Sequence, residues 1–141
     1  MKYVLDASVG FKWAVSETDS DKANRLRDDF RNAVHVLLAP DVLPGEVGPA
    51  LTRAERQGKI PVGDAVILLN DVLQTCSVLH ASYPLLLRAC EISSQTRVGF
   101  FDCLYVALAE RENCQLVTAD TRLVNAIQLP FPFVIALSSL P

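Results

Sequence analysis

Four acidic residues are spaced so that their carboxylates could gather and hold metal ions. Asp6 and Asp120 each follow a short strand-like run, while Glu46 and Asp102 stand near the starts of two helical patterns. In an open parallel sheet, ligands bind in the crevice beyond the carboxyl ends of the strands, which is where these side chains would meet. Because like charges in one pocket repel each other, we expect raised carboxyl pKa values without metal, and a pocket that needs cations.

Each of these acids also has a structural explanation when it is taken alone. Asp6, Asp102 and Asp120 could each cap a helix, since an N-cap needs only one short acceptor side chain. Glu46 could be a solvated surface glutamate. Taken together, the four acids indicate a shared site more strongly than any one of them does. At least three of them fall at strand ends or helix starts that face the same edge of the sheet.

Strand-like and helical segments alternate along the chain and would position these acids. The expected strands are residues 3–5, 36–39, 77–80, 115–118 and 133–137. The expected helices are 7–15, a segment opened by Asp19 or Ser20, a segment ending at 57, and then 61–73, 83–96, 103–110 and 120–127. This alternation predicts an α/β fold of three layers, α/β/α, with helices on both faces of a central, mostly parallel sheet of about five strands.

Two of the expected helices have informative apolar patterns. The segment after Asp19 has one buried face, because its apolar residues recur at helical spacing, namely Ala23, Leu26, Phe30 and Ala33. The helix over 103–110 is apolar nearly all round, so we expect it to be buried.

Composition indicates a globular protein of modest charge. The length of 141 residues favours a single domain over 1–141, and a half-hydrophobic composition with 21% charged residues fits a compact fold. With a net charge of −3, the chain has no large excess of basic residues that could wrap nucleic acid. A nucleic-acid substrate would have to be bound by a few local basic residues. No apolar run approaches ~20 residues, so we expect no membrane span. With no secretory start, the cytoplasm is the expected location.

The cysteines and histidines predict no site of their own. Cys76, Cys90, Cys103 and Cys114 form no CxxC pair, so a zinc site is not expected. Cys103 is expected as a small buried hydrophobe. The two histidines are isolated, and no catalytic role is assigned to them.

Four segments in a fixed order carry the most specific signal. They are residues 4–9 followed by Lys12 and Trp13, residues 39–41 leading to Glu46 and 50–51, residues 101–110, and residues 116–120. By these segments the chain resembles the PIN-domain ribonucleases, especially the VapC-type toxins of prokaryotic toxin–antitoxin pairs. The resemblance runs nearly end to end and implies one PIN-like domain.

The resemblance implies a reaction and a set of partners. Asp6, Glu46, Asp102 and Asp120 would be the catalytic acids that hold Mg²⁺ or Mn²⁺ for hydrolysis of RNA phosphodiester bonds. Hard divalent ions prefer oxygen ligands, and two such ions can activate a water and stabilise the leaving oxygen. Thr118 resembles the small hydroxyl residue beside the last acid, although an ordinary strand role explains it equally well. The implied partners are RNA, a second copy in a homodimer, and a small antitoxin.

Two positions depart from the family pattern. Pro49 stands where the family commonly has Asn, and proline removes a backbone donor and breaks or starts a helix. If the helix starts near Gly48, Glu46 lies in the preceding turn rather than on the helix. Phe101 stands where Tyr is frequent and lacks its hydroxyl. Neither change removes a carboxylate.

Basic residues near the acids are candidates for holding RNA phosphates, although each is also explained as a surface charge. These candidates are Lys12, Arg53, Arg97 and Arg122. Trp13 is expected in the core or at an interface. The nearly uncharged stretch from Val62 to Leu73 could be a partner surface, but a core helix is favoured.

Two alternatives to a ribonuclease stay open at this point. The chain could be a non-catalytic PIN-like module that binds RNA or a protein, with a metal site weakened around Pro49. It could also be a phosphotransfer protein. The phosphotransfer alternative is disfavoured because Ser8 stands where an aspartyl phosphatase needs a second Asp.

Overall fold

A five-stranded parallel sheet forms the centre of the computed structural model, which describes residues 1–75 and 78–141. Its order is β3-β2-β1-β4-β5, and every neighbouring pair is parallel. The strands are β1 (Lys2–Leu5), β2 (Val36–Pro40), β3 (Val78–His80), β4 (Gln115–Thr118) and β5 (Val134–Ala136). This confirms the predicted α/β fold. Cys76, and Ser77 at the start of the expected third strand, lie outside the described residues.

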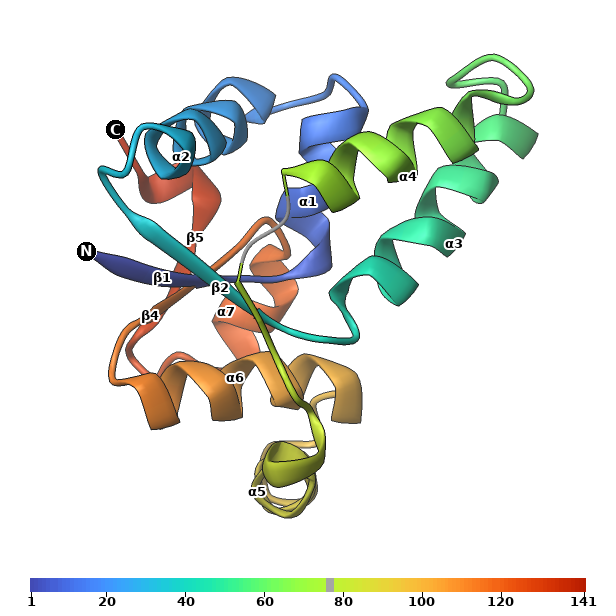
Figure 1. Cartoon of the computed structure of the whole chain (residues 1–141). Coiled ribbons are helices and arrows are strands. Elements are labelled where there is room, and N and C mark those ends of the chain that lie inside the picture. Colours follow the sequence, from blue (N-terminus) through green and yellow to red (C-terminus); the bar gives the residue numbers. More distant parts are fainter. Residues whose placement is uncertain (76–77) are drawn as a thin grey trace.

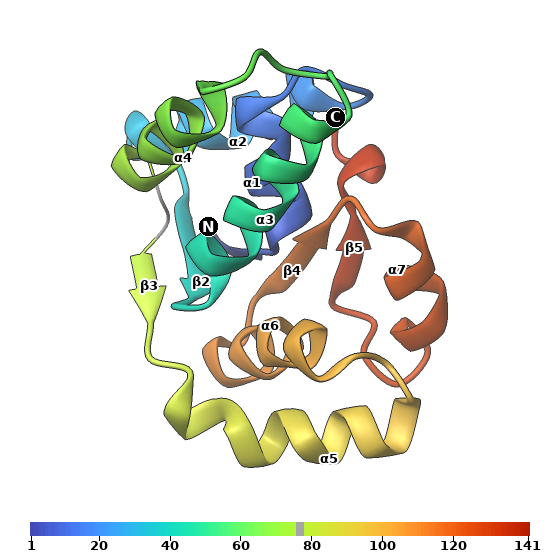
Figure 2. The same cartoon turned by 90° about the vertical axis from the view of Figure 1, so that its right-hand side faces the viewer.

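Helices cover both faces of the sheet, as predicted. They are α1 (Ala7–Ala14), α2 (Ser20–Arg31), α3 (Leu43–Arg56), α4 (Asp64–Gln74), α5 (Leu86–Thr96), α6 (Phe100–Glu112) and α7 (Thr121–Ile127), with short 3-10 turns at Tyr83–Leu85 and Leu137–Ser139. Helices α1 and α2 lie over one face, and α3 and α4 form a hairpin packed on α1 (Figure 1). On the other face α6 packs beneath β1, β2 and β4, α7 packs on β4 and β5, and α5 lies outside α6 (Figure 2).

The chain changes direction across the sheet between β1 and β4. From β1 it passes to β2 and β3 on one side, and then it returns to β4 and β5 on the other. Open α/β sheets bind their ligands at such a switch point, beyond the carboxyl ends of the strands. Residues just after β1 and β4 therefore occupy the position where a site is expected. Asp6 and Asp120 are such residues.

Helix α6 forms the centre of the core on its side of the sheet. Every residue from Cys103 to Ala109 is buried, as its all-round apolar character predicts. Arg88 of α5 fixes the outer helix to α6 through two bonds to Glu110, from Nε at 2.7 Å and from a terminal nitrogen at 2.9 Å. These bonds hold the C-terminal end of α6, and the packing of α6 on β1, β2 and β4 fixes the helix against the sheet.

Helix α3 starts earlier than its prolines suggest. It begins at Leu43 rather than near Gly48, and Pro49 lies inside it. An interior proline costs about 3 kcal/mol. Burying the side chains of Leu43, Val47 and Leu51 on one face is worth roughly 1.5–3 kcal/mol each, so the helix persists through the proline. Glu46 is therefore on the helix, and its N–H donates to the carbonyl of Val42 at 3.0 Å.

Several expected boundaries are wrong. Ala33 lies beyond α2, exposed and with a φ of 58°, because α2 already ends at Arg31. Helix α4 starts after Gly63, whose φ of 93° suits glycine, and not in a turn around Pro61. Asp102 is the third residue of α6 and not its cap.

Helix α4 is also not the core helix that was favoured for 62–73. Only its inner face, with Ala65 and Val72, is buried. Val66 is 77% exposed, and Val62 just before the helix is 92% exposed. No helix in the described ranges, 1–75 and 78–141, is both long enough and apolar enough to cross a membrane.

Candidate functional site

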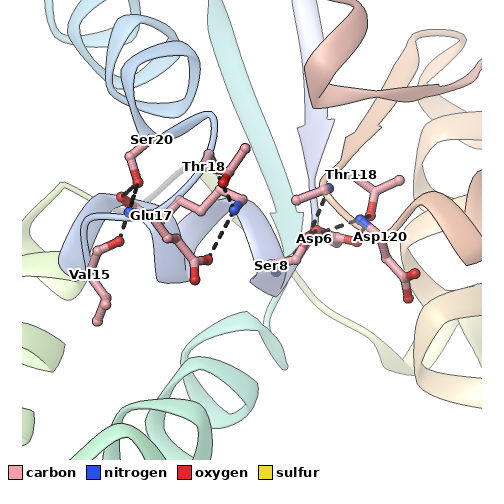
Figure 3. Close-up of polar contacts among 10 residues, drawn as sticks. Asp6, Ser8, Val15, Glu17, Thr18, Ser20, Thr118 and Asp120 are labelled. Carbon is pink, nitrogen blue, oxygen red and sulfur yellow. Dashed lines mark hydrogen bonds and ion pairs between the residues drawn. The ribbon is translucent and has the colours of Figure 1, made fainter. Parts of the chain in front are cut away.

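Asp6 is the buried anchor of the acidic group. It follows β1, caps α1 and is only 5% exposed. Its Oδ1 accepts bonds from the backbone N–H of Ser8, at 3.1 Å, and from the Ser8 hydroxyl. Its Oδ2 accepts a bond from the hydroxyl of Thr118 in β4 (Figure 3). Both carboxylate oxygens of Asp6 are thus held in place. Asp6 is the N-cap of α1 and at the same time a candidate residue of the site.

Two hydroxyl groups join the ends of β1 and β4. Thr118 is fully buried, and its Oγ1 accepts a bond from the Asp120 N–H at 3.0 Å. The Ser8 Oγ accepts a bond from the Ala119 N–H at 2.9 Å and lies 3.5 Å from the Thr118 Oγ1. Each hydroxyl donates to Asp6 and accepts from a backbone N–H just after β4, that of Ala119 for Ser8 and that of Asp120 for Thr118. Thr118 therefore does more than fill a strand position.

Asp120 caps a helix with one carboxylate oxygen and keeps the other available for a ligand. Its Oδ1 accepts bonds from the N–H groups of Arg122, at 3.0 Å, and Leu123, at 3.4 Å, so it caps α7. Both bonds use one oxygen, which lets Oδ2 take a further ligand. The side chain is exposed and lies next to Asp6 and Thr118 (Figure 3).

Asp102 stands between the other acids. It is half-buried in the first turn of α6, close enough to the N-terminal glycine that a Cβ on Gly99 would lie 3.6 Å from its Oδ2. Burial raises its pKa most, and repulsion from Glu46 and Asp120 raises it further. Repulsion from Asp102 in turn contributes to the raised pKa of Asp6. These effects indicate that Asp102 lies near Glu46, Asp120 and Asp6, and that the raised pKa values of Asp6 and Asp102 come first from burial and then from repulsion between carboxylates.

Glu46 receives a hydrogen bond from the opposite side of the fold. Its Oε1 accepts a bond from the hydroxyl of Tyr105 at 2.6 Å. Burial, and then the bond to Glu46, raise the pKa of Tyr105 far above its usual range, so the hydroxyl keeps its proton and is the donor. Pro49, placed on the same helix and exposed, does not displace Glu46 from the site.

Two supporting residues were missed by reasoning from the sequence. Ser8 was used only as an argument against a phosphatase, and Tyr105 was quoted only as part of a motif. Signals for both were present, because Ser8 lies two residues after Asp6 and Tyr105 lies one helical turn after Asp102. Neither spacing shows which carboxylate accepts the hydrogen bond. For Tyr105 that carboxylate belongs to Glu46, which is distant in the sequence.

Glu46 forms the wall between two hollows. One, of about 390 Å³, has mixed polar lining and includes Ala7, Ser8, Phe11, Lys12, Glu17, Glu46, Ala50, Ala119 and Asp120. The other, of about 470 Å³, is mainly apolar and is lined by Val42, Gly45, Glu46, Pro49 and Phe101. The acidic site therefore has on one side a hollow that carries charged residues among apolar ones, and on the other side a hollow that is almost wholly apolar.

The predicted basic residues are placed unequally. Lys12 lines the polar hollow, and its Nζ donates to the Glu17 Oε1 at 3.0 Å and to the Thr18 carbonyl at 2.7 Å. The other three candidates are exposed, namely Arg53, Arg97 and Arg122. Trp13 is half-buried against the core, and its Nε1 donates to the Ala23 carbonyl at 2.8 Å, as a core position requires.

The donor set fits a hard divalent cation. Over the described residues, no three His, Cys, Asp or Glu side chains are grouped closely enough to form a cage for a metal ion. Mg²⁺ does not need one, because it keeps several waters and is usually held by one or two carboxylates together with substrate phosphates. The site offers carboxylate oxygens, with Asp6 and Asp120 beside each other, which suits Mg²⁺ or Mn²⁺.

The buried charge of Asp6 predicts a stability that depends on pH. Burial raises its pKa from 3.8 to about 6, against the opposing bonds from Ser8 and Thr118. A carboxyl with a raised folded pKa contributes stability that is complete below pH 3.8 and is lost as pH rises through 6. Lowering the pH from 7 to 5 should therefore stabilise the metal-free protein by about 1 kcal/mol.

Urea unfolding in EDTA at pH 7 and pH 5 measures this gain. The control is Asp6→Asn, which cannot ionise and should lose about 1 kcal/mol of the difference between the two pH values. Because Asp102 also has a raised pKa, a smaller gain of the same sign should remain. An equal gain in the wild type and in Asp6→Asn would contradict the prediction.

The match to a protein-family model spans all four acids. A family model described as PIN domain matches residues 3–127. Ribonuclease VapC1 of Mycobacterium tuberculosis is 40% identical over 107 residues, which cover 74% of this chain and 74% of that protein. Ribonuclease VapC3 of the same organism is 33% identical over 123 residues, covering 87% and 85%.

Two solved structures share the arrangement of helices and strands. The crystal structure of PAE2754 from Pyrobaculum aerophilum matches with a TM-score of 0.70 at 25% identity, covering 99% of this chain and 94% of that one. Mycobacterium tuberculosis VapC20, described as a sarcin–ricin loop cleaving toxin, matches with a TM-score of 0.59 at 17% identity, covering 83% and 87%. The second likeness concerns the fold alone.

Proposed function

This chain belongs to the PIN-domain family of VapC-type ribonucleases, and on that premise we propose that it is an RNA-cleaving toxin whose acids hold Mg²⁺ or Mn²⁺. The residues proposed to bind the ions and carry out catalysis are Asp6, Glu46, Asp102 and Asp120. The observation that supports the proposal is the charge repulsion that Asp102 shares with Glu46, Asp120 and Asp6, which come from separate segments around the switch point between β1 and β4. The whole chain, 1–141, is proposed to act as one PIN-like domain.

The chain's own groups prepare the site for phosphodiester hydrolysis. Bound divalent ions would supply an activated water and stabilise the leaving oxygen of an in-line displacement. Asp6 is held by two hydroxyls, Glu46 by Tyr105, and Asp120 by the N–H groups that open α7. Carboxylates that are already oriented lose less freedom when they bind an ion, which favours a productive geometry. No histidine or serine nucleophile is required.

Cleavage of RNA that depends on a divalent ion is the test of this proposal. The purified chain should cut end-labelled RNA with Mg²⁺ or Mn²⁺, should stop when EDTA is added, and should recover when the ion is returned in excess. Products are followed on denaturing gels. Undiminished cutting in EDTA would exclude a metal-dependent reaction at these acids.

A non-catalytic PIN-like module remains the second candidate, since no finished cage is present in the described part of the chain. Calorimetric titration with Mn²⁺ separates the two candidates. Binding accompanied by RNA cleavage supports the enzyme. Absence of both, with RNA binding retained, would favour the module.

The two hollows beside Glu46 suggest how RNA lies on the protein. We propose that the scissile phosphate approaches the acids from the polar hollow, where Lys12 lies, and that a flanking unpaired base enters the apolar hollow. The ring of Phe101 is 55% exposed there, one residue before Asp102. Base stacking on an aromatic side chain is tolerant of sequence, which suits such a position. Arg53, Arg97 and Arg122 remain candidates for outer phosphates.

Protein partners are proposed from the family and from one exposed surface. We propose a homodimer and a small antitoxin that neutralises it. The outer side of α4 supports such contacts, because it exposes Val66, Ile67 and Leu73, and Val62 lies beside them. Exposed apolar residues gathered on one helix are typical of interaction surfaces. A small neighbouring reading frame whose product binds this chain would identify the antitoxin.

A further inference from the structure

The Glu46 carboxylate is connected to the sheet side of the site by one side chain. Glu46 belongs to α3, which packs mainly on α4 and α1, whereas Asp102 belongs to α6 beneath the sheet. Tyr105 of α6 bridges the two with its hydroxyl, 2.6 Å from the Glu46 Oε1. We propose that Tyr105 is a positioning residue of the metal centre, which fixes the carboxylate of Glu46 so that its other oxygen faces the cation. This inference rests on the proposed function and extends it to a residue outside the acidic quartet.

Among the residues that the structure describes, the bond from Tyr105 is the one side-chain hydrogen bond that orients the Glu46 carboxylate. It is half-buried, with three side-chain torsions to fix. Pro49, one turn further along α3, has an apolar side chain and offers no hydrogen bond. A hydroxyl donating to a carboxylate makes a charge-assisted bond, which is roughly twice as strong as a bond between neutral groups. A single bond of this kind is enough to select one orientation of the side chain.

Tyr105 is itself rigid, which makes it a suitable support. The residue is only 1% exposed and lies in the buried run Cys103–Ala109 of α6. It follows Asp102 by one helical turn, so the same helix supplies one acid and the donor that orients another. Buried tyrosine hydroxyls require a partner, and satisfying this hydroxyl alone would explain the bond equally well. The experiment must therefore separate positioning from simple satisfaction of a core group.

The separating measurement is the affinity of the metal-free protein for Mn²⁺, obtained by calorimetry without RNA. Tyr105→Phe keeps the ring and removes only the hydroxyl, and loss of such a supporting bond typically weakens metal binding about 10- to 100-fold. The melting temperature should change by less than about 4 °C, because Glu46 stays partly solvated. The same change should have no further effect in a Glu46→Gln background, since the hydroxyl then has no carboxylate to orient.

The control is Tyr3→Phe, which removes the hydroxyl of another buried tyrosine, bonded to the Met1 sulphur on the other face of the sheet. It should leave Mn²⁺ affinity unchanged. Equal affinity in the wild type and Tyr105→Phe would overturn the positioning role while the proposed function stands. An equal weakening by Tyr105→Phe with and without Glu46→Gln would also overturn it, by showing a general structural effect. If the wild type binds no Mn²⁺, the proposed function fails first and the inference fails with it.

Discussion

Replacing Asp102 by Asn is expected to abolish RNA cleavage, with a loss of well over about 100-fold. Loss of a residue that only supports a metal ligand lowers metal affinity or activity by up to about 100-fold. Asp102 is proposed as a direct ligand, so its loss should cost more. Its charge interacts with Glu46, Asp120 and Asp6, so it occupies the centre of the acidic group. Asn is close in shape but carries no charge, so the variant loses an anionic ligand without losing a contact.

Stability measurements distinguish this loss from unfolding. The charge of Asp102 is disfavoured in the fold, because burial and repulsion raise its pKa. Removing the charge should leave the metal-free protein as stable as the wild type or more so at pH 7, by the sign of that shift. The matched control is Asp71→Asn, which neutralises an exposed carboxylate on α4 and should cleave normally. Full activity in Asp102→Asn would refute its assignment as a metal ligand.

Removing the aromatic ring of Phe101 should weaken RNA binding and leave the rate of the chemical step nearly unchanged. Stacking of one base on an aromatic side chain is worth about 1–3 kcal/mol, so Phe101→Ala should raise KM about 5- to 150-fold. The acids are unaffected, so kcat at saturating RNA should change little. Initial rates over a range of RNA concentrations measure both constants.

The comparison variant for Phe101 is Tyr83→Ala, which removes another highly exposed aromatic ring. Tyr83 precedes α5 near the end that Arg88 joins to Glu110, at the far end of α6 from Phe101. Its loss should leave KM unchanged. A fall in kcat without a rise in KM for Phe101→Ala would contradict a base-binding role and would instead place Phe101 in support of Asp102.

Burial explains why some element boundaries could be predicted and others not. The run 103–109 has no charged residue on any face, so no arrangement other than burial suits it, and the structure buries all of it. The start of the helix that contains Pro49 stayed open, because local helix rules omit the apolar face of α3, whose burial outweighs the proline. Helix α4 shows the converse error, since its apolar residues do not reveal whether anything covers them.

The sequence by itself determined the α/β fold and the parallel sheet, because strand and helix periodicities are local properties, and it singled out four acids as candidates by their place in short motifs. The local helix caps of Asp6 and Asp120 follow from the sequence, but only the tertiary structure decided which distant residues the acids contact. Thr118 reaches Asp6 across 112 positions, and Tyr105 reaches Glu46 across 59. Such bonds depend on strand order and on which helix covers which face, and these are set by the packing of the whole core. The orientation of Glu46 is therefore a property of the fold and not of its own segment.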